Sequence, residues 1–357
     1  KGHKMKKITK LFLVIFSVAS LSVTSVFAGD LNVTGGVTAT YKVNGADQAA
    51  GKGMGVSNEL DFNASGELDN GFAWTWQTQL DGASTLNDDT KLTLTAGEMG
   101  TIGMFISEGG LSSKFGYGVG AMGVGSDYTG PSSVEHGINV DGYNNVQYHT
   151  PAGLMPFGIT AKVGYVPNLA VNDGASAKAD GLINTGATGK DMTQVRLDAK
   201  PIDGLEIGAD YANTSGALQT VRYNAESGGA YAKYSIGSFT VGAAVSAYQP
   251  TENTGGTVNA QSSIHYETEM YGVQMAVNDA LSISYSEEKA TKATSSELSG
   301  VSVRTSVDDI DMKIKHIQAA YTVGGATVGL AIADADDADY VVGKAEKTTT
   351  FSLAIAF

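Results

Sequence analysis

The residues of this sequence most able to carry out chemistry are its histidines. Beyond residue 28 there are four, His136, His149, His265 and His316, and each lies on a different segment. A hydrolytic site would need a serine, a histidine and an orienting acid or amide within hydrogen-bond reach. Ser263 and His265 share one strand face, but Ser-x-His is a common chance pattern. We therefore expect no enzymatic activity and no catalytic residues.

Acidic and glycine-rich segments are the next candidates. Asp334, Asp336, Asp337 and Asp339 could offer oxygen ligands to calcium, but their spacing is not that of a calcium-binding loop. Whether the acidic loop 334–339 binds divalent cations stays open. Gly116–Gly120 lacks the strand-then-helix context of a dinucleotide site. With no cysteine for a thiolate site and no basic patch for nucleic acid, we expect no metal, no cofactor and no nucleic-acid partner.

Composition limits the elements that could position such residues. Glycine accounts for 46 of 357 residues, charged residues for 17% and hydrophobic residues for 42%. A disordered acidic chain needs lower hydrophobicity and denser charge, which excludes that class. A cytosolic enzyme built on long helices would carry more Glu, Lys and Leu in place of Gly and Thr.

The N-terminus has the pattern of an export signal. Lys6, Lys7 and Lys10 precede an apolar run over 11–19, and Val26-Phe27-Ala28 supplies small residues at the cleavage positions. We expect residues 1–28 to be an N-terminal extension plus a cleaved secretory signal peptide, leaving 29–357 as one domain. Removing five lysines and no acids changes the formal charge from −14 to −19.

The rest of the chain alternates apolar and polar side chains, which is typical of strands with two different faces. We count sixteen such runs, joined alternately by short turns and longer loops, with all six prolines in turns or loops. An even number of strands with this alternation is typical of an antiparallel transmembrane β-barrel. The runs 261–277 and 309–323 change phase midway, which either a bulge or an extension beyond the bilayer would explain.

A soluble β-sandwich or β-solenoid would also show alternating strands. Three features argue against both. Aromatic residues gather near strand ends on one face, as in an interfacial girdle. The opposite face is polar on nearly every run, so it cannot form a dry core. No fixed-period repeat indicates a solenoid. The predicted fold class is therefore all-β, a transmembrane antiparallel β-barrel of about sixteen strands.

The sequence resembles the general porins of Gram-negative outer membranes, which are trimeric sixteen-stranded barrels. Phe351, Leu353, Ile355 and the terminal Phe357 match the C-terminal strand signature of outer-membrane barrels, which the resemblance implies is an assembly signal. The segment 143–151 is similar to a family stretch, with Gln147 where the family often has arginine. The resemblance implies that the longest loop, about 108–141, folds inward and narrows a channel.

The resemblance also implies a constriction with opposite charges on its two sides. The loop side would carry Glu108, Asp127, Glu135 and Asp141; the wall side would carry Lys42, Lys91, Lys162 and Arg196. Further inward-facing residues are expected at Glu59, Asp61, Asp81, Asp198, Glu206, Asp210, Glu267, Glu269, Glu288, Lys200 and Lys233. Glu59 and Asp61 depart from the family, which usually clusters arginines on its early strands.

These expectations together indicate an outer-membrane porin that passes small hydrophilic solutes and ions by passive diffusion, with a mild preference for cations. The implied partners are outer-membrane lipids and lipopolysaccharide, two further copies in a homotrimer, the permeating solutes and the barrel assembly machinery. A substrate-selective channel with a lumen binding site and a non-conducting structural or adhesive barrel are the alternatives.

Overall fold

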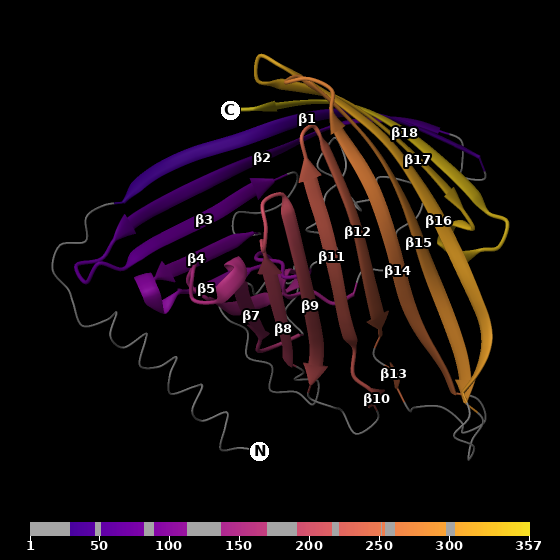
Figure 1. The fold of residues 1–357 in the computed structure, drawn as a ribbon, viewed down its shortest axis with the longest axis horizontal. Helices are drawn as coiled ribbons and strands as arrows, with labels where there is room; N and C mark the ends of the chain where they lie inside the picture. Colours follow the sequence, from indigo (N-terminus) through magenta and orange to yellow (C-terminus); the bar gives the residue numbers. More distant parts are fainter. Residues whose placement is uncertain are drawn as a thin grey trace.

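The computed structural model describes residues 29–46, 51–81, 89–112, 137–169, 191–215, 221–250, 252–253, 261–297 and 304–357. In it, sixteen antiparallel strands close into one barrel (Figure 1), as the alternation predicts. The predicted signal peptide lies outside the described residues. No helix among them is long and apolar enough to cross a membrane.

The barrel strands follow one another around the wall nearly in chain order. They are β1 (Asp30–Ala46), β2 (Gly51–Glu67), β3 (Ala73–Asp81), β4 (Thr90–Thr95), β5 (Thr101–Ile106), β6 (Asn144–His149), β7 (Thr160–Val166), β8 (Asp191–Ala199), β9 (Leu205–Ser215), β11 (Glu226–Ile236), β12 (Phe239–Gln249), β14 (Gln261–Ala276), β15 (Leu281–Glu297), β16 (Arg304–Val323), β17 (Ala326–Asp336) and β18 (Ala345–Ala356). The barrel closes where Gly36 of β1 pairs with Glu59 of β2 on one side and with Ala356 of β18 on the other.

Alternating exposure separates the two faces of each strand. On β8, Met192 and Gln194 are fully buried, whereas the alternate residues Thr193 and Val195 are exposed. Cross-strand pairing carries this phase from strand to strand, because directly paired residues lie on the same face. Even-numbered residues of β8 and β9 therefore face the lumen, and odd-numbered residues face outward.

The two ends of the barrel differ in their connections. Short turns join strands at one end, for example around Gly204, where φ is +77° and an added Cβ would lie 2.4 Å from the Ser235 carbonyl oxygen, so glycine is required. The opposite end carries the long connections. Next to these lies a small sheet that the sequence did not predict, β10 (Val221–Tyr223) paired with β13 (Glu252–Asn253).

The wall is low on one side and tall on the other (Figure 1). Strands β4 to β7 have six or seven residues each, whereas β14, β15 and β16 have 16, 17 and 20. The alternation in the sequence predicts loops near 44–55 and 289–308, and the structure makes both of them shorter. Their flanking strands extend to Ala46 and from Gly51, and to Glu297 and from Arg304. Paired backbone groups satisfy each other in water as well as in lipid, so hairpins can continue beyond a membrane.

No bulge causes the change in alternation that the sequence shows within 261–277 and 309–323. Strand β16 keeps one phase, with Met312, Ile314, His316 and Gln318 all buried on the lumen side. The register shift between β15 and β16 lies elsewhere, at Thr294/Ser295. Strand β14 also keeps its phase, so Thr268 and Met270 are buried and face the lumen. The inward placement of Glu267 and Glu269 was therefore wrong, because both are exposed on the outer face.

Candidate functional site in the barrel lumen

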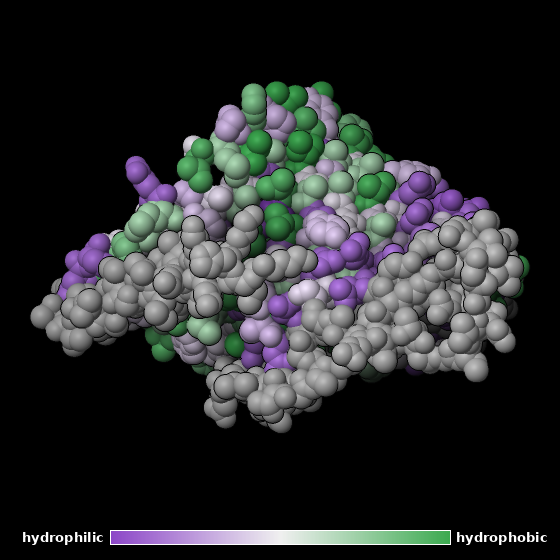
Figure 2. Space-filling model, turned by 90° about the horizontal axis from the view of Figure 1, so that it is seen from below, coloured by the Kyte–Doolittle hydropathy of each residue, from purple (hydrophilic) through white to green (hydrophobic). Residues whose placement is uncertain are grey.

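The lumen wall is polar where the outer wall is apolar. One inner row runs from His149 through Lys162 and Arg196 to Asp210 on successive strands. The adjacent outer row on the same strands runs through Tyr148, Val163, Val195 and Tyr211. Seen from below, hydrophobic residues gather at one edge of the molecule, and hydrophilic ones lie in the middle and at both sides (Figure 2). A tube with this distribution can hold water inside while its outside faces lipid.

Arg196 is the centre of a charged network on the inner wall of β8, β9 and β11. Its Nε lies 2.9 Å from the Asp198 carboxylate, and its guanidinium lies 6.0 Å from the centre of the Tyr231 ring. The Tyr231 hydroxyl reaches Asp198 at 3.2 Å and Glu206 at 3.0 Å. Glu206 in turn lies 3.6 Å from Lys233. Among the described residues, the carboxylate that neutralises Arg196 is thus Asp198 of its own strand.

One acid of the long loop pairs with a lysine of the wall. The Lys91 ammonium lies 3.7 Å from the Glu108 carboxylate at the start of the long loop. Asp141, near the other end of the loop, accepts a hydrogen bond of 2.7 Å from the Asn139 amide. Lys42 and Lys162 face the lumen as predicted, and neither has an ion pair among the described residues. Asp127 and Glu135 lie outside those residues, as does the side chain of Asp81.

Both ends of the long loop fold into the barrel. Leu111 and Val140 are buried in one apolar cluster with Val166, Met192 and Ala212, which are lumen-facing residues of β7, β8 and β9. The Val140 N–H donates to the Gln194 side-chain oxygen at 3.0 Å. The Arg196 guanidinium donates to the Ser112 carbonyl at 3.2 Å. The loop is therefore attached to the inner wall at both of its described ends, 107–112 and 137–143.

The anchoring residues Leu111, Val140 and Gln194 were not singled out from the sequence. Their signal was nevertheless present, because Val166 and Met192 are large apolar residues at inward positions of strands that are otherwise polar inside. Apolar side chains at such positions need a protein partner to exclude water. The long loop is that partner.

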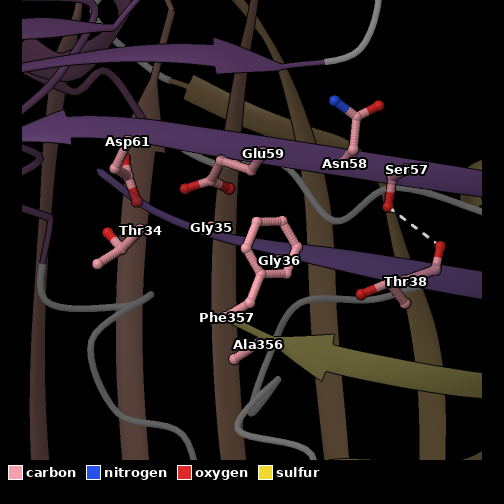
Figure 3. Close-up of a pocket in the computed structure, with 10 residues that line it drawn as sticks. All are labelled: Thr34, Gly35, Gly36, Thr38, Ser57, Asn58, Glu59, Asp61, Ala356 and Phe357. Atoms are coloured by element: carbon pink, nitrogen blue, oxygen red, sulfur yellow. Dashed lines mark hydrogen bonds between the residues drawn. The ribbon is translucent and has the colours of Figure 1, made fainter. Parts of the chain in front are cut away.

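A separate recess of about 830 Å³ lies against the inner wall of β1, β2 and the end of β18 (Figure 3). Glu59 and Asp61 project into it from β2 on the same side as Thr34, while Asn58 points to the opposite side. Gln79 donates to Glu59 at 3.1 Å, and Gln77 donates to Asp61 at 2.9 Å. Each carboxylate thus accepts a hydrogen bond from a neutral amide, which orients it on the lumen wall.

The outer face of the tall wall changes from apolar to charged within one row. Val273, Tyr285, Ile317 and Ile332 form one cross-strand row. The next row toward the long connections reads Tyr271, Glu287, Lys315, Asp334 and Lys347. The hydroxyls of Tyr271 and Tyr285 both donate to the Glu287 carboxylate at this boundary. Tyrosines with one apolar and one polar end are typical of a membrane interface.

Solved structures of other proteins have a similar architecture. No family model matches the chain, and no curated protein matches its sequence. Among solved structures, in-vitro folded OmpT, an outer membrane protein of Vibrio cholerae, is similar with a TM-score of 0.64 and 11% identity, over 94% of this chain and 100% of that one. The chain has the barrel fold of the general porins.

Two further structures share this porin fold. An anion-selective porin from Comamonas acidovorans has a TM-score of 0.60 and 13% identity, over 92% of this chain and 100% of the other. OmpF of Salmonella typhi, in complex with daunomycin, has a TM-score of 0.57 and 12% identity, over 94% and 100%. At these identities the likeness concerns the fold, so activity must be argued from the residues of this chain.

Proposed function

We propose that this protein is an outer-membrane porin that lets small hydrophilic solutes and ions diffuse through its lumen. The observation that carries the proposal is the sixteen-stranded closure with a polar inner face, an apolar outer face and a long loop attached to the inner wall. A wet pore narrowed at one level performs passive diffusion without catalytic groups. No enzymatic role is proposed.

Planar-bilayer recording tests this proposal directly. The full chain should insert and give ion conductance in steps, with reversal potentials that report its selectivity. Current block by one particular solute would favour the alternative of a substrate-selective channel. If the protein is folded, as shown by heat-modifiable migration on gels, but gives no conductance, the result would contradict the proposal and favour a structural or adhesive role.

We expect the long connections to face the cell exterior and the short turns to face the periplasm. Val342 lies in the connection between β17 and β18 with 77% of its surface exposed, and Ile202 lies in the turn between β8 and β9 with 61% exposed. Val342→Cys should react with an impermeant thiol reagent on intact cells, whereas Ile202→Cys should react only after the outer membrane is opened. The reverse labelling pattern would contradict this orientation.

A homotrimer is the expected assembly. Strands of six or seven residues, as in β4 to β7, fall short of the ~9–11 residues that a tilted strand needs to cross a bilayer. This low side of the wall therefore requires protein cover, while the tall side can face lipid. OmpT of Vibrio cholerae, which shares the fold, is described in a trimer form. Mass measurement of the detergent-extracted protein should give three copies.

Mild cation preference is proposed from the distribution of paired and acidic groups. The basic side chains of the Arg196 network are matched by Asp198 and Glu206, whereas Asp61 accepts a hydrogen bond from the neutral amide of Gln77. The Comamonas acidovorans porin with this fold is anion-selective, so the fold alone does not set the preference. Further negative charge that favours cations would come from the loop acids Glu108, Asp127, Glu135 and Asp141.

The double change Glu59→Gln and Asp61→Asn should shift the reversal potential toward anions, because it removes two charges and keeps the hydrogen-bonding shape. Lys42→Gln with Lys162→Gln should shift it toward cations. Both shifts should shrink as salt rises, since the Debye length falls from ~10 Å at 0.1 M to ~3 Å at 1 M. An anion-selective wild-type pore would show that the basic wall outweighs the acidic recess.

A further inference from the structure

The connection between β17 and β18, residues 337–344, also lies across the inner wall. Its short helical turn η4 (Ala338–Tyr340) packs on Ala290, Met312, Ile314 and Ala335. Met312, Ile314 and Ala335 have no exposed surface, and neither has Ala338. Met312 and Ile314 face the lumen on β16, so the connection leans into the barrel instead of standing above its rim.

Its reach along the wall can be followed through Tyr340. The Tyr340 ring lies 5.7 Å from the ring of Tyr266, which is on β14, and the Lys292 ammonium of β15 lies 5.8 Å from the Tyr340 ring centre. Tyr266 in turn stacks on Tyr248 of β12 at 6.1 Å. Since β17 and β14 are three strands apart, the connection covers ~14 Å of inner wall at ~4.8 Å per strand.

The connection is internally fixed in this position. The Ala338 N–H donates to the Lys344 carbonyl at 2.9 Å, and the Gly343 N–H donates to the Asp337 carboxylate at 2.6 Å. Lys344 pairs with Asp339 and with Glu346, and these carboxylates raise the pKa of Lys344. The backbone φ angles of Asp337, Asp339 and Tyr340 lie between +53° and +58°. This left-handed conformation is unfavourable for residues other than glycine. The apolar packing of Ala338 and Tyr340 offsets that cost.

We propose that residues 337–344 form a second constriction of the lumen, on the β14–β18 wall, separate from the long loop that is attached to β7–β9. This proposal rests on the proposed channel function and deepens it. Two loops attached to different parts of the inner wall narrow the passage from two sides. The second one presents the exposed Asp339 to solutes near the mouth, beside Lys292 of β15, and thus contributes to the size and charge that the pore selects.

The matched pair Ala338→Asp and Val342→Asp tests the proposal. Both place the same charge in the same connection, but Ala338 is fully buried against the wall while Val342 is 77% exposed. In planar bilayers, Ala338→Asp should raise the unit conductance and admit larger neutral polymers, because a buried carboxylate forces the connection off the wall. Val342→Asp should leave polymer exclusion at the wild-type value.

If Ala338→Asp does not fold, a shortened connection with residues 338–342 replaced by two glycines can be tested in its place. Unit conductance and polymer exclusion are measured in the same way. It removes the constriction while leaving β17 and β18 intact. Enlarged passage in either wall-detaching variant supports the proposal. Wild-type conductance and exclusion in the shortened variant would overturn it, while the channel function would stand. A wild-type barrel without conductance would instead overturn the channel function.

Discussion

Replacing Phe357 by Asp is expected to reduce the amount of folded protein in the outer membrane by well over tenfold. Phe357 ends the barrel by exchanging two backbone hydrogen bonds of 2.9 Å with Gly35 of β1. Its ring lies on the outer face near Gly35, in the same outward series as Phe351, Leu353 and Ile355. Phe357 is 67% exposed, so removing its ring contact would cost only about 0.5–1 kcal/mol of folding free energy. A loss beyond the removed contact and the cost of a lipid-facing carboxylate would therefore indicate that the terminal ring is read during assembly.

Ala356→Asp is the matched control, one residue earlier in the same strand. Ala356 pairs with Gly36 and lines the recess beside Glu59, so its side chain points to the lumen (Figure 3). A carboxylate there remains in water, whereas one on the lipid face costs ~2–4 kcal/mol near mid-bilayer and less at the interface. Outer-membrane yield, measured by heat-modifiable migration on gels, should be near wild type for Ala356→Asp. Equal losses of outer-membrane yield in Ala356→Asp and Phe357→Asp would show that the yield does not depend on whether the changed side chain faces lipid or the lumen.

Alternation predicts this structure well wherever the two faces meet water and lipid. Phe351, Leu353 and Ile355 face outward and Lys162 and Arg196 face inward as expected, since each strand has one wet face and one apolar face. The rule fails above the membrane, where both faces are free of lipid. There Glu267 and Glu269 point outward, and the inward positions of β16 are apolar.

The inward apolar residues of β16 explain why the sequence alone left the phase change open. Met312 and Ile314 are covered by residues 337–344, a contact between segments that no periodicity encodes. The charged network behaves likewise. Arg196 binds Asp198 of its own strand and lies over the ring of Tyr231, which is 35 positions later in the chain. Register places these residues on one face, but rotamers and nearest neighbours decide which of them pair.

Val140→Asn is expected to release the long loop from the wall and to produce frequent openings of higher conductance. Val140 is fully buried among Leu111, Val166, Met192 and Ala212, and its side chain lies close to Gly164 of β7. Burying an amide without a partner costs about 1–3 kcal/mol. At 1.4 kcal/mol per factor of ten, the ratio of detached to attached loop should rise about fivefold to a hundredfold. A neutral residue leaves the charge of the constriction unchanged, so reversal potential should move little.

Val342→Asn provides the control, because the same substitution at an exposed valine removes no buried contact. Single-channel recording should show brief large openings in Val140→Asn and none beyond wild type in Val342→Asn. Gly164→Leu should give the same phenotype from the wall side, since a Cβ there already lies 3.0 Å from Leu111 and 3.1 Å from Val140. Unchanged conductance in both Val140→Asn and Gly164→Leu would mean that the loop ends do not control the passage. The narrowest level would then have to be sought at residues 337–344.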